Sequence, residues 1–329
     1  MSGKTYNKDL VFVILNYNIV NETRECIKTI FTNLDTKEVH VLVVDNCSSN
    51  GAGKKLAEIY KNHQKVSVIL NQENSGFARG NNIGIREALK MNPKYICCIN
   101  NDTLIPKQKF FSLIDKEYER YHPAIIGPKI VLKDGTINRL NRYLHTIENY
   151  EEMIRKRQRA LNTNDFSRGV ESKNPIKKAI RKLPGSFQYN YHAMREILKG
   201  NFYCGKSRNV ILHGCCYIFT PAFFEKLDGF YDRTFMFGEE EHLYLSLLEN
   251  GLTDVYLPSI KIRHLEDAST DATFAQEEEK TRFFYKNSID SFNLLIERMK
   301  KDEDIIPGYY IDKKEQKLSW LQHRRNRNR

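Results

Sequence analysis

The chain has 329 residues and a net charge of +11, and 40% of its residues are apolar. That length suffices for one large domain or two smaller ones. The mean hydropathy of -0.57, together with the lack of any apolar run near 18 residues, argues against a transmembrane helix. The N-terminus has no apolar signal-peptide core, so we expect a cytoplasmic protein.

The first 130 residues alternate short apolar runs with segments of helical periodicity. The pattern predicts strands over 11–16, 39–44, 66–70 and 95–99. Between them it predicts helices over 22–34, 52–62 and 77–90. Such alternation predicts an α/β fold with a mostly parallel central sheet flanked by helices. Ligands of such sheets bind at the carboxyl ends of the strands. Polar residues stand at these ends: Asn16, Tyr17, Asn18, Asp45, Asn46, Asn71, Asn100, Asn101 and Asp102.

The alternation stops after a further predicted strand over 124–132. Residues 133–212 carry 17 Lys and Arg against 7 Asp and Glu, which is nearly the whole excess of positive charge. We interpret 133–209 as a basic insertion. Its charge favours a phosphate-rich partner, either nucleic acid or an anionic membrane leaflet. A solvated helical face explains the charge equally well.

The alternation resumes in residues 210–270. A strand is predicted over 210–220, a helix over 221–227, an acidic helix over 239–250 and a strand near 259–263. Residues 271–329 contain a long amphipathic helix, which we expect to pack against the domain, and a basic tail. The seven cysteines have no Cys-x-x-Cys spacing, and we interpret them as reduced thiols of the core.

Three groups of residues have the chemistry of a binding or catalytic site. The Gly- and Asn-rich turn at 74–84 lies at a strand-to-helix junction, where a diphosphate can approach the backbone closely. Asp102 is placed to hold Mg²⁺ or Mn²⁺ together with substrate phosphates, and Asp45 to accept a hydrogen bond from a base or ribose. Glu239 and Glu240 open a helix, and repulsion between them favours a raised pKa in one, as a general base requires.

The order and spacing of these pieces resemble glycosyltransferase family 2, with the GT-A nucleotide-diphospho-sugar fold, and within it the bacterial rhamnosyltransferase-like branch. The resemblance covers about residues 10–132 and 213–269. The matching pieces are VFVILNYN, VVDNCSSNG, NQENSGFARGNNIGI, INNDTLIP, HGCCYIFTPAFFEKLDGFYDRTFMFGEEEHL and IRHLEDAS. The resemblance implies four parts: a nucleotide-sugar-binding half at 1–132, the insertion at 133–209 on the acceptor or membrane side, an acceptor and catalytic half at 210–270, and the C-terminal part at 271–329.

The resemblance also implies a role for each matching residue. Those expected near the donor's base and ribose are Tyr17, Asn18 and Asp45, and those expected near its diphosphate are Asn74, Gly76, Arg79 and Asn81. Asn101 and Asp102 stand at the family's Asp-x-Asp-like element, with Asp102 as the metal contact. Glu240 falls on the catalytic base with Glu239 as its partner, and His264 on a histidine that approaches the metal or diphosphate.

This chain departs from the family's usual Glu-Asp-x-Asp, which here is Glu239-Glu240-Glu241-His242. The resemblance still implies an inverting, metal-dependent transfer, assisted by Mn²⁺ or Mg²⁺, from a UDP- or dTDP-sugar to a glycan or lipid-linked acceptor. Bacterial surface polysaccharide synthesis is the expected setting, with peripheral attachment to the inner face of the membrane and no nucleic-acid partner.

Two other interpretations remain open at this point. One is a basic protein that binds nucleic acid or a membrane surface without catalysis, which salt-sensitive binding without donor binding would favour. The other is a sugar-phosphate nucleotidyltransferase with a similar sheet. Against it, Asn16-Tyr17-Asn18 occupies the place where a Gly- and Arg-rich loop would follow the first strand.

Overall fold

The computed structural model describes residues 5–138, 140, 144–166, 205–265 and 276–301. Its strands are β1 (Lys8–Asn16), β2 (Val39–Asp45), β3 (Val66–Leu70), β4 (Pro93–Asn100), β5 (Thr103–Leu104), β6 (Ile125–Val131), β7 (Ser207–Arg208), β8 (Cys216–Phe219) and β9 (Asp254–His264). Its helices are α1 (Asn21–Asn33), α2 (Ala52–Tyr60), α3 (Gly76–Leu89), α4 (Phe110–Tyr121), α5 (Ile147–Thr163), α9 (Pro221–Phe224), α10 (Glu239–Glu249) and α12 (Glu277–Lys301).

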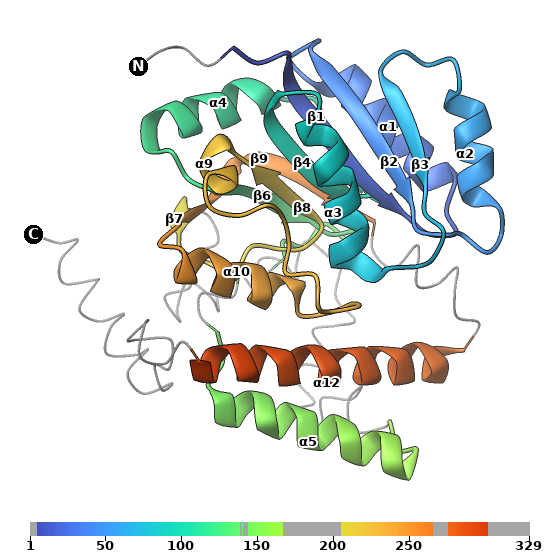
Figure 1. Ribbon diagram of the computed structural model, residues 1–329, viewed down its shortest axis with the longest axis vertical. Helices are drawn as coiled ribbons and strands as arrows, with labels where there is room; N and C mark the ends of the chain where they lie inside the picture. Colours follow the sequence, from blue (N-terminus) through green and yellow to red (C-terminus); the bar gives the residue numbers. More distant parts are fainter. Residues whose placement is uncertain (1–4, 139, 141–143, 167–204, 266–275, 302–329) are drawn as a thin grey trace, which may run out of the picture.

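These strands form one sheet with the order β3-β2-β1-β4-β8-β6-β9-β5, and β7 pairs with β9 at the side (Figure 1). The strands β3, β2, β1 and β4 are parallel, as are β6 and β9. Strand β8 is antiparallel to both β4 and β6, and β5 and β7 are antiparallel to β9. The predicted α/β sheet flanked by helices is confirmed. The prediction that the sheet is mostly parallel holds for β3, β2, β1 and β4, whereas the other strands form a mixed arrangement.

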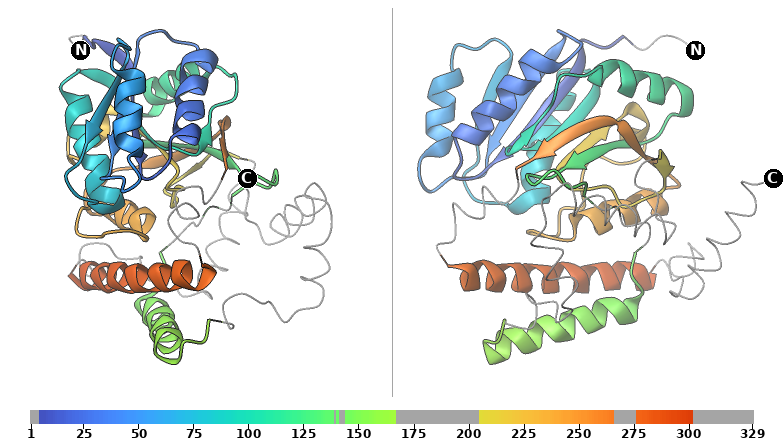
Figure 2. Two further views of the ribbon diagram at one scale, coloured as in Figure 1. Left: turned by 90° about the vertical axis from the view of Figure 1, so that its right-hand side faces the viewer. Right: turned by 180° about the vertical axis from the view of Figure 1, so that it is seen from behind.

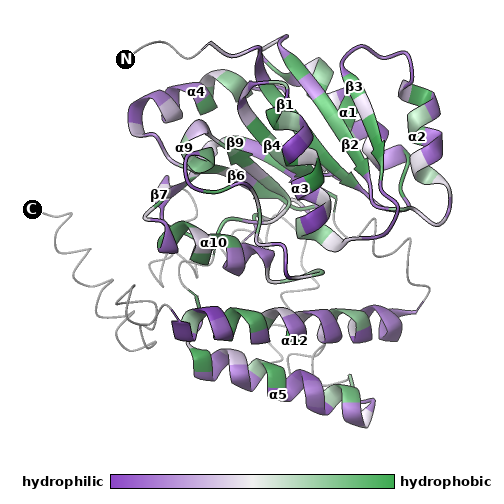
Figure 3. Cartoon of the chain, in the orientation of Figure 1, coloured by the Kyte–Doolittle hydropathy of each residue, from purple (hydrophilic) through white to green (hydrophobic). Residues whose placement is uncertain are grey.

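Helices cover both faces of the sheet because the central strands are apolar on both sides. One cluster joins alternate residues of β1, such as Phe12 and Ile14, to apolar side chains of α1, α2 and α4. The other cluster joins Val11 and Val13 of the same strand to α3, α9 and α10. Figure 3 shows the resulting pattern, with hydrophobic strands between helices whose outer faces are hydrophilic. The carboxyl ends of β1, β2 and β4 are thereby held in register at one edge.

Helices α12 and α5 form a further layer below α10 (Figure 2). The predicted amphipathic helix is confirmed, and its apolar face buries Phe292, Leu295 and Met299. This face packs against Tyr150 and Ile154 of α5, within a third cluster that also includes Leu245 of α10. A helix from the basic stretch is therefore joined to the helix that begins with Glu239. The division of the chain at 132, 209 and 270 stays a prediction.

Several sequence-based expectations concern residues outside the described ranges. They include residues 167–204 of the predicted basic insertion, with Cys204 among them, and the C-terminal basic tail. The six described cysteines are free, and all except Cys47 are buried, as expected for thiols of the core. None of the helices in the described part of the chain is long and apolar enough to cross a membrane.

Candidate functional site

A hydrogen-bonded hub at Asn46 shapes the turn between β3 and α3. Its Nδ2 donates to Asn74 Oδ1 (2.8 Å) and to the Gly76 carbonyl (3.0 Å). Its Oδ1 accepts from the backbone N–H and the hydroxyl of Ser75, both at 3.1 Å, and from Asn71 Nδ2 at 3.0 Å. Asn46 was not among the predicted site residues, although its place directly after β2 is the signal that points to it. The hub fixes the turn in one conformation.

Gly76 sits where no side chain fits. It has a φ of +79°, and a Cβ placed on it would lie 2.1 Å from the Phe235 carbonyl oxygen. The N–H of Phe77 donates to that same carbonyl at 2.8 Å. The turn after β3 therefore contacts the loop that leads into α10, about 160 residues later in the chain.

The Asp45 carboxylate is buried and already well supplied with donors. It accepts from Asn16 Nδ2 (2.8 Å) and from the N–H and hydroxyl of Ser48 (3.0 and 2.5 Å). A Cβ on Gly53 would lie 2.2 Å from this carboxylate. Asp45 thus fastens the loop after β2 to β1, and a contact with a base or ribose stays a prediction.

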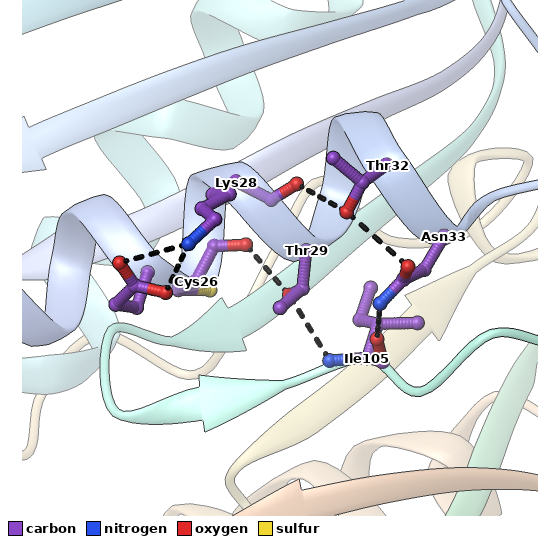
Figure 4. Close-up of polar contacts among 7 residues, drawn as sticks. Cys26, Lys28, Thr29, Thr32, Asn33 and Ile105 are labelled. Carbon is purple, nitrogen blue, oxygen red and sulfur yellow. Dashed lines mark hydrogen bonds and ion pairs between the residues drawn. The ribbon is translucent and has the colours of Figure 1, made fainter.

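Asp102 stands in the short turn between β4 and β5, which α1 holds in place. The Asn33 Nδ2 donates to the Ile105 carbonyl (2.7 Å), and the Ile105 N–H donates to Thr29 Oγ1 (3.1 Å), as Figure 4 shows. On the other side of the turn, Asn101 Nδ2 donates to Asn16 Oδ1 at 3.1 Å. The turn that carries Asp102 is therefore anchored at both ends.

His264 reaches Asp102 because β5 and β9 are antiparallel and Thr103 pairs with His264. The His264 Nε2 lies 3.2 Å from Asp102 Oδ1, and only 12% of the His264 side chain and 7% of the Asp102 side chain are exposed. This contact lacks hydrogen-bond geometry, and both Asp102 Oδ1 and His264 Nδ1 are buried without a hydrogen-bond partner among the described residues. Buried polar atoms normally find partners, so these two are available to a further group.

The pair fits a divalent cation. A carboxylate and an imidazole suit Mn²⁺, and Mg²⁺ accepts a single carboxylate when substrate phosphates supply further oxygens. In the described part of the chain, no three His, Cys, Asp or Glu side chains gather as a complete metal site. A cation at Asp102 and His264 would therefore depend on the substrate for its remaining ligands.

Glu239 and Glu240 begin α10, directly after Phe237 and Gly238, which have φ values of 70° and 82°. The Glu239 Oε1 accepts from the Phe237 N–H at 2.7 Å, and the Glu240 Oε1 accepts from the Gly214 N–H at 2.5 Å. Burial raises the pKa of Glu239 to about 7. Burial, followed by the charge of Glu241, raises the pKa of Glu240 to about 8. These are values at which a carboxylate acts as a base near neutral pH.

His213 lies between the two halves of the site and was not predicted as a site residue. Its ring centroid is 5.7 Å from that of His264, and its Nδ1 is 3.9 Å from Glu240 Oε1. Burial lowers the pKa of His213 to about 4, so the ring is neutral at physiological pH. Its Nδ1 accepts from the Cys215 N–H at 3.0 Å, which fixes the ring orientation.

A cavity of about 710 Å³ brings most of the predicted residues together. The predicted residues that line it are Tyr17, Asn74, Gly76, Asn101, Asp102, Glu239, Glu240 and His264. Asp102 and Glu240, 138 residues apart in the chain, thus face one space. This volume lies within the range typical of small-molecule sites.

Four predicted residues do not line the cavity: Asn18, Asp45, Arg79 and Asn81. Asn18 has a φ of 60°, and its N–H donates to Ser48 Oγ at 2.7 Å. Arg79 is exposed, and its Nε donates to the Asp232 carbonyl at 2.8 Å. The buried Asn81 donates to the Phe77 carbonyl of its own helix. Because α3 already begins at Gly76, Arg79 and Asn81 lie too far along it to form the turn. Their predicted contacts with a diphosphate gain no support from this geometry.

The opposite wall of the cavity is aromatic and was missed by sequence reasoning. It includes Phe283, Phe284 and Phe292 of α12 and Arg157 of α5. The Phe237 ring packs edge-on against Phe284, with centroids 4.7 Å apart. The periodicity of residues 273–301 indicates an apolar face, but no signal in the sequence says that one part of this face lines a site.

Comparisons with known proteins agree with this architecture. The family model described as glycosyl transferase family 2 matches residues 11–172. The chain is 28% identical over 128 residues to the dTDP-rhamnosyl transferase RfbF of Shigella flexneri, covering 39% of this chain and 40% of the relative. It is 27% identical over 154 residues to the putative teichuronic acid biosynthesis glycosyltransferase TuaG of Bacillus subtilis, covering 45% and 58%. Each match spans less than two thirds of the relative's length.

Among solved structures, the crystal structure of GalNAc-T7 with UDP, GalNAc and Mn²⁺ is similar in fold. The TM-score is 0.53 at 13% sequence identity, and the alignment covers 91% of this chain and 58% of the other. With its mixed sheet and flanking helices, this chain has the GT-A fold, and its residues 11–172 are similar to glycosyltransferase family 2.

Proposed function

We propose that this protein is an inverting, metal-dependent glycosyltransferase. It transfers a sugar from a UDP- or dTDP-sugar to a hydroxyl group of a glycan or lipid-linked acceptor, in the synthesis of a surface polysaccharide. One observation carries the proposal: Asp102 with His264 and Glu240 line a single cavity beside the turn held by Asn46. The named activities of RfbF and TuaG support the reaction class and the setting.

The edge formed by the ends of β1, β2 and β4 suits the donor. Tyr17 and Asn46 line the cavity there, and Asn74 and Gly76 present the backbone of the turn. A turn at the N-terminus of a helix attracts anions, which favours a diphosphate beside α3. Asp102 and His264 would hold Mn²⁺ or Mg²⁺ against that diphosphate. When bound, the cation would neutralise the charge that develops on the leaving group.

Glu240 is the proposed general base. Its carboxylate takes the proton of the acceptor hydroxyl while the acceptor oxygen forms a bond to the anomeric carbon. The bond between that carbon and the diphosphate oxygen breaks in the same step, which inverts the anomeric configuration and leaves no sugar on the enzyme. The Gly214 N–H fixes the position of the carboxylate, and its burial makes it a stronger base than an ordinary glutamate.

The exposed basic residues of α5 suggest how the protein meets a lipid-linked acceptor. Arg155 and Arg159 are exposed, as is Lys156 between them. Basic groups near an anionic leaflet contribute about 1 kcal/mol each. Flotation with anionic liposomes tests this part: binding at low salt that is lost at high salt supports it, and no binding at either salt concentration removes it.

Screening nucleotide sugars tests the whole proposal. The protein is mixed with UDP- and dTDP-sugars, with and without Mn²⁺, and thermal stabilisation and donor hydrolysis are measured. At least one donor should stabilise the protein more with Mn²⁺ than without, and Asp102→Asn should remove the difference. If no nucleotide sugar stabilises the protein under either condition, the proposal is wrong.

A further inference from the structure

The guanidinium of Arg157 is placed at the cavity wall without a matching polar partner. It lies over the rings of Phe284 and Phe292, at 5.0 and 4.7 Å from their centroids. Its NH1 atom is buried and has no hydrogen-bond partner among the residues that the structure describes. In the described part of the chain, no carboxylate lies within 4.0 Å of this guanidinium. Aromatic faces stabilise a cation but leave its N–H groups unbound.

A buried guanidinium group without hydrogen-bond partners has an unfavourable free energy in its charged form, and its pKa is lowered as a result. Burial lowers the pKa of Arg157, although the charges of Tyr285 and Glu241 act in the opposite direction. Arginine presents a planar fork of donors that matches a carboxylate or a phosphate. A ligand that brings such an anion into the cavity would satisfy the buried NH1.

Arg157 stands on the side of the cavity away from the proposed donor edge. The donor edge is formed by the ends of β1, β2 and β4, whereas Arg157 belongs to α5, the layer beyond α12 (Figures 1 and 2). Glu240 lines the cavity from α10, which lies between the sheet and α12. A molecule that offers its hydroxyl to Glu240 from this side would meet the aromatic wall and Arg157.

The charge of the wall is compatible with an anion. Three glutamates, Glu239 to Glu241, would repel one if all were ionised. Burial raises the pKa of each of them, to about 7 for Glu239 and about 8 for Glu240. At neutral pH these two are therefore partly protonated, which reduces their repulsion of an anion. The charges of Glu241 and Arg157 act on each other, but no ion pair within 4.0 Å joins these two described residues, so the guanidinium stays open to an anion.

We propose that Arg157 binds an anionic group of the acceptor, a carboxylate or a phosphate on a sugar, while the phenylalanines of α12 contact the sugar ring. This inference rests on the proposed function, because it assigns the second substrate of the same site. It makes Arg157 a determinant of acceptor specificity and gives the helix of the basic insertion a role in the site itself.

Three sugars that differ at one carbon test the proposal. Methyl glucoside, methyl glucuronide and methyl glucoside 6-phosphate are titrated into the full chain in the presence of UDP and Mg²⁺. We expect at least one anionic sugar to bind at least about tenfold more tightly than the neutral one, and Arg157→Gln to remove that preference. The better of the two anions identifies the group.

Arg155→Gln is the matched control. Arg155 is two residues away on the same helix, its side chain is 63% exposed, and it pairs with Glu151 at 3.7 Å. It should keep the preference for the anionic sugar. If the neutral sugar binds as tightly as both anions, or if the preference survives Arg157→Gln, the proposal is wrong.

Two further readouts separate this inference from the proposed function. The affinity for UDP should be the same in Arg157→Gln and the wild type, and an equal loss of UDP binding would assign Arg157 to the donor instead. Failure of the wild type to bind any nucleotide would contradict the proposed function, and the same sugar titrations repeated without UDP measure the preference for an anion independently of it. If Arg157→Gln does not fold, Arg157→Lys is used: it should weaken the anionic sugar only, because lysine lacks the fork, and an unchanged affinity would contradict the proposal.

Discussion

The two walls of the cavity differ in how far their polar groups are satisfied. At the strand ends, Asn46 has partners on both its amide oxygen and its nitrogen, and Asp45 accepts several hydrogen bonds. On the other side, Arg157 NH1 has no hydrogen-bond partner in the described ranges, and the pKa of Glu240 is raised to about 8. The first wall already has its hydrogen bonds made and offers a ligand a fixed surface. The second wall has polar groups that a bound ligand would supply with partners. If the strand ends bind the donor and the wall formed by α10, α12 and α5 binds the acceptor, as proposed, we expect the donor edge to be rigid and this acceptor wall to reach its final charge state only with substrate bound.

Removing the Asp102 carboxylate should have the largest effect. If Asp102 holds the cation, Asp102→Asn should lower kcat by about 10³-fold or more, because charge stabilisation by a metal contributes several kcal/mol. Steady-state kinetics with Mn²⁺ measure the loss. Asp290→Asn, the same change at an exposed position of α12, should have no effect. A full rate in Asp102→Asn would place any cation elsewhere.

Glu240→Gln separates chemistry from binding. We expect kcat to fall by about 10²- to 10⁴-fold, since a general base contributes that much, while the Kd for UDP stays nearly unchanged. Kinetics and calorimetric titration with UDP give the two quantities. Glu297→Gln, at an exposed position of α12, serves as the control. A variant that keeps more than about a tenth of the normal rate contradicts the role as base.

The donor edge is tested by Asn46→Ala. The change leaves the Ser75 N–H and the Asn74 carboxamide without their partner, so we expect a loss of about 1–3 kcal/mol in the free energy of unfolding. The affinity for UDP should fall by about tenfold as the turn loosens. Asn62→Ala, at an exposed position, is the comparison. Unchanged UDP binding in a folded Asn46→Ala variant would show that the turn is not part of the donor site.

The wall formed by α10, α12 and α5 is tested by the pH dependence of the reaction. A base must be deprotonated, so kcat/KM should rise with pH up to about 8, by about tenfold per pH unit below the pKa of Glu240. Glu241→Gln removes the like charge that is the second cause of the raised pKa, after burial. It should move the inflection of the profile to lower pH without restoring the ordinary value of a carboxyl group. A profile that is flat between pH 6 and 9 would contradict this assignment.

The stability of the fold should respond to pH in the opposite direction. A carboxyl group whose pKa is raised on folding binds its proton more tightly in the folded state, so its stabilising contribution is lost as pH rises through about 8. The melting temperature of Glu240→Gln, relative to that of the wild type, should therefore rise as pH increases from 6 to 9. Thermal unfolding across this range measures the difference, and a constant difference would contradict a raised pKa of Glu240 in the folded protein.

The donor edge was largely predictable from the sequence because its signals are local. Continuous apolar runs predict β1 to β4, and the strand predicted over 66–70 has the observed bounds of β3. The polar residue that ends a strand is then placed at the edge of the sheet by topology alone. Asn46 is also a polar residue directly after a strand, so its place at this edge was predictable. Its hydrogen bonds to Asn71 and Ser75 were not, because they depend on the conformation of the turn around 71–76, which no sequence periodicity specifies.

The acceptor wall was not predictable to the same degree because its contacts are distant in sequence. Helix α10 was expected over 239–250, close to its observed bounds, since Gly238 and Gly251 frame it. The approach of Arg157 to Phe292 depends instead on the packing of α5 against α12, across about 135 residues of chain. The direction of β8 could not be predicted either. Its four residues are all buried, and such a short apolar run does not indicate whether the neighbouring strands are parallel or antiparallel to it.

A crystal structure with UDP and Mn²⁺ decides whether Asp102 and Glu240 serve one site. We expect the cation to be coordinated by the Asp102 carboxylate and by the diphosphate, and the Glu240 carboxylate to face the diphosphate end of the nucleotide across the cavity. Nucleotide bound outside this cavity, or a cation bound to the diphosphate without Asp102, would contradict it.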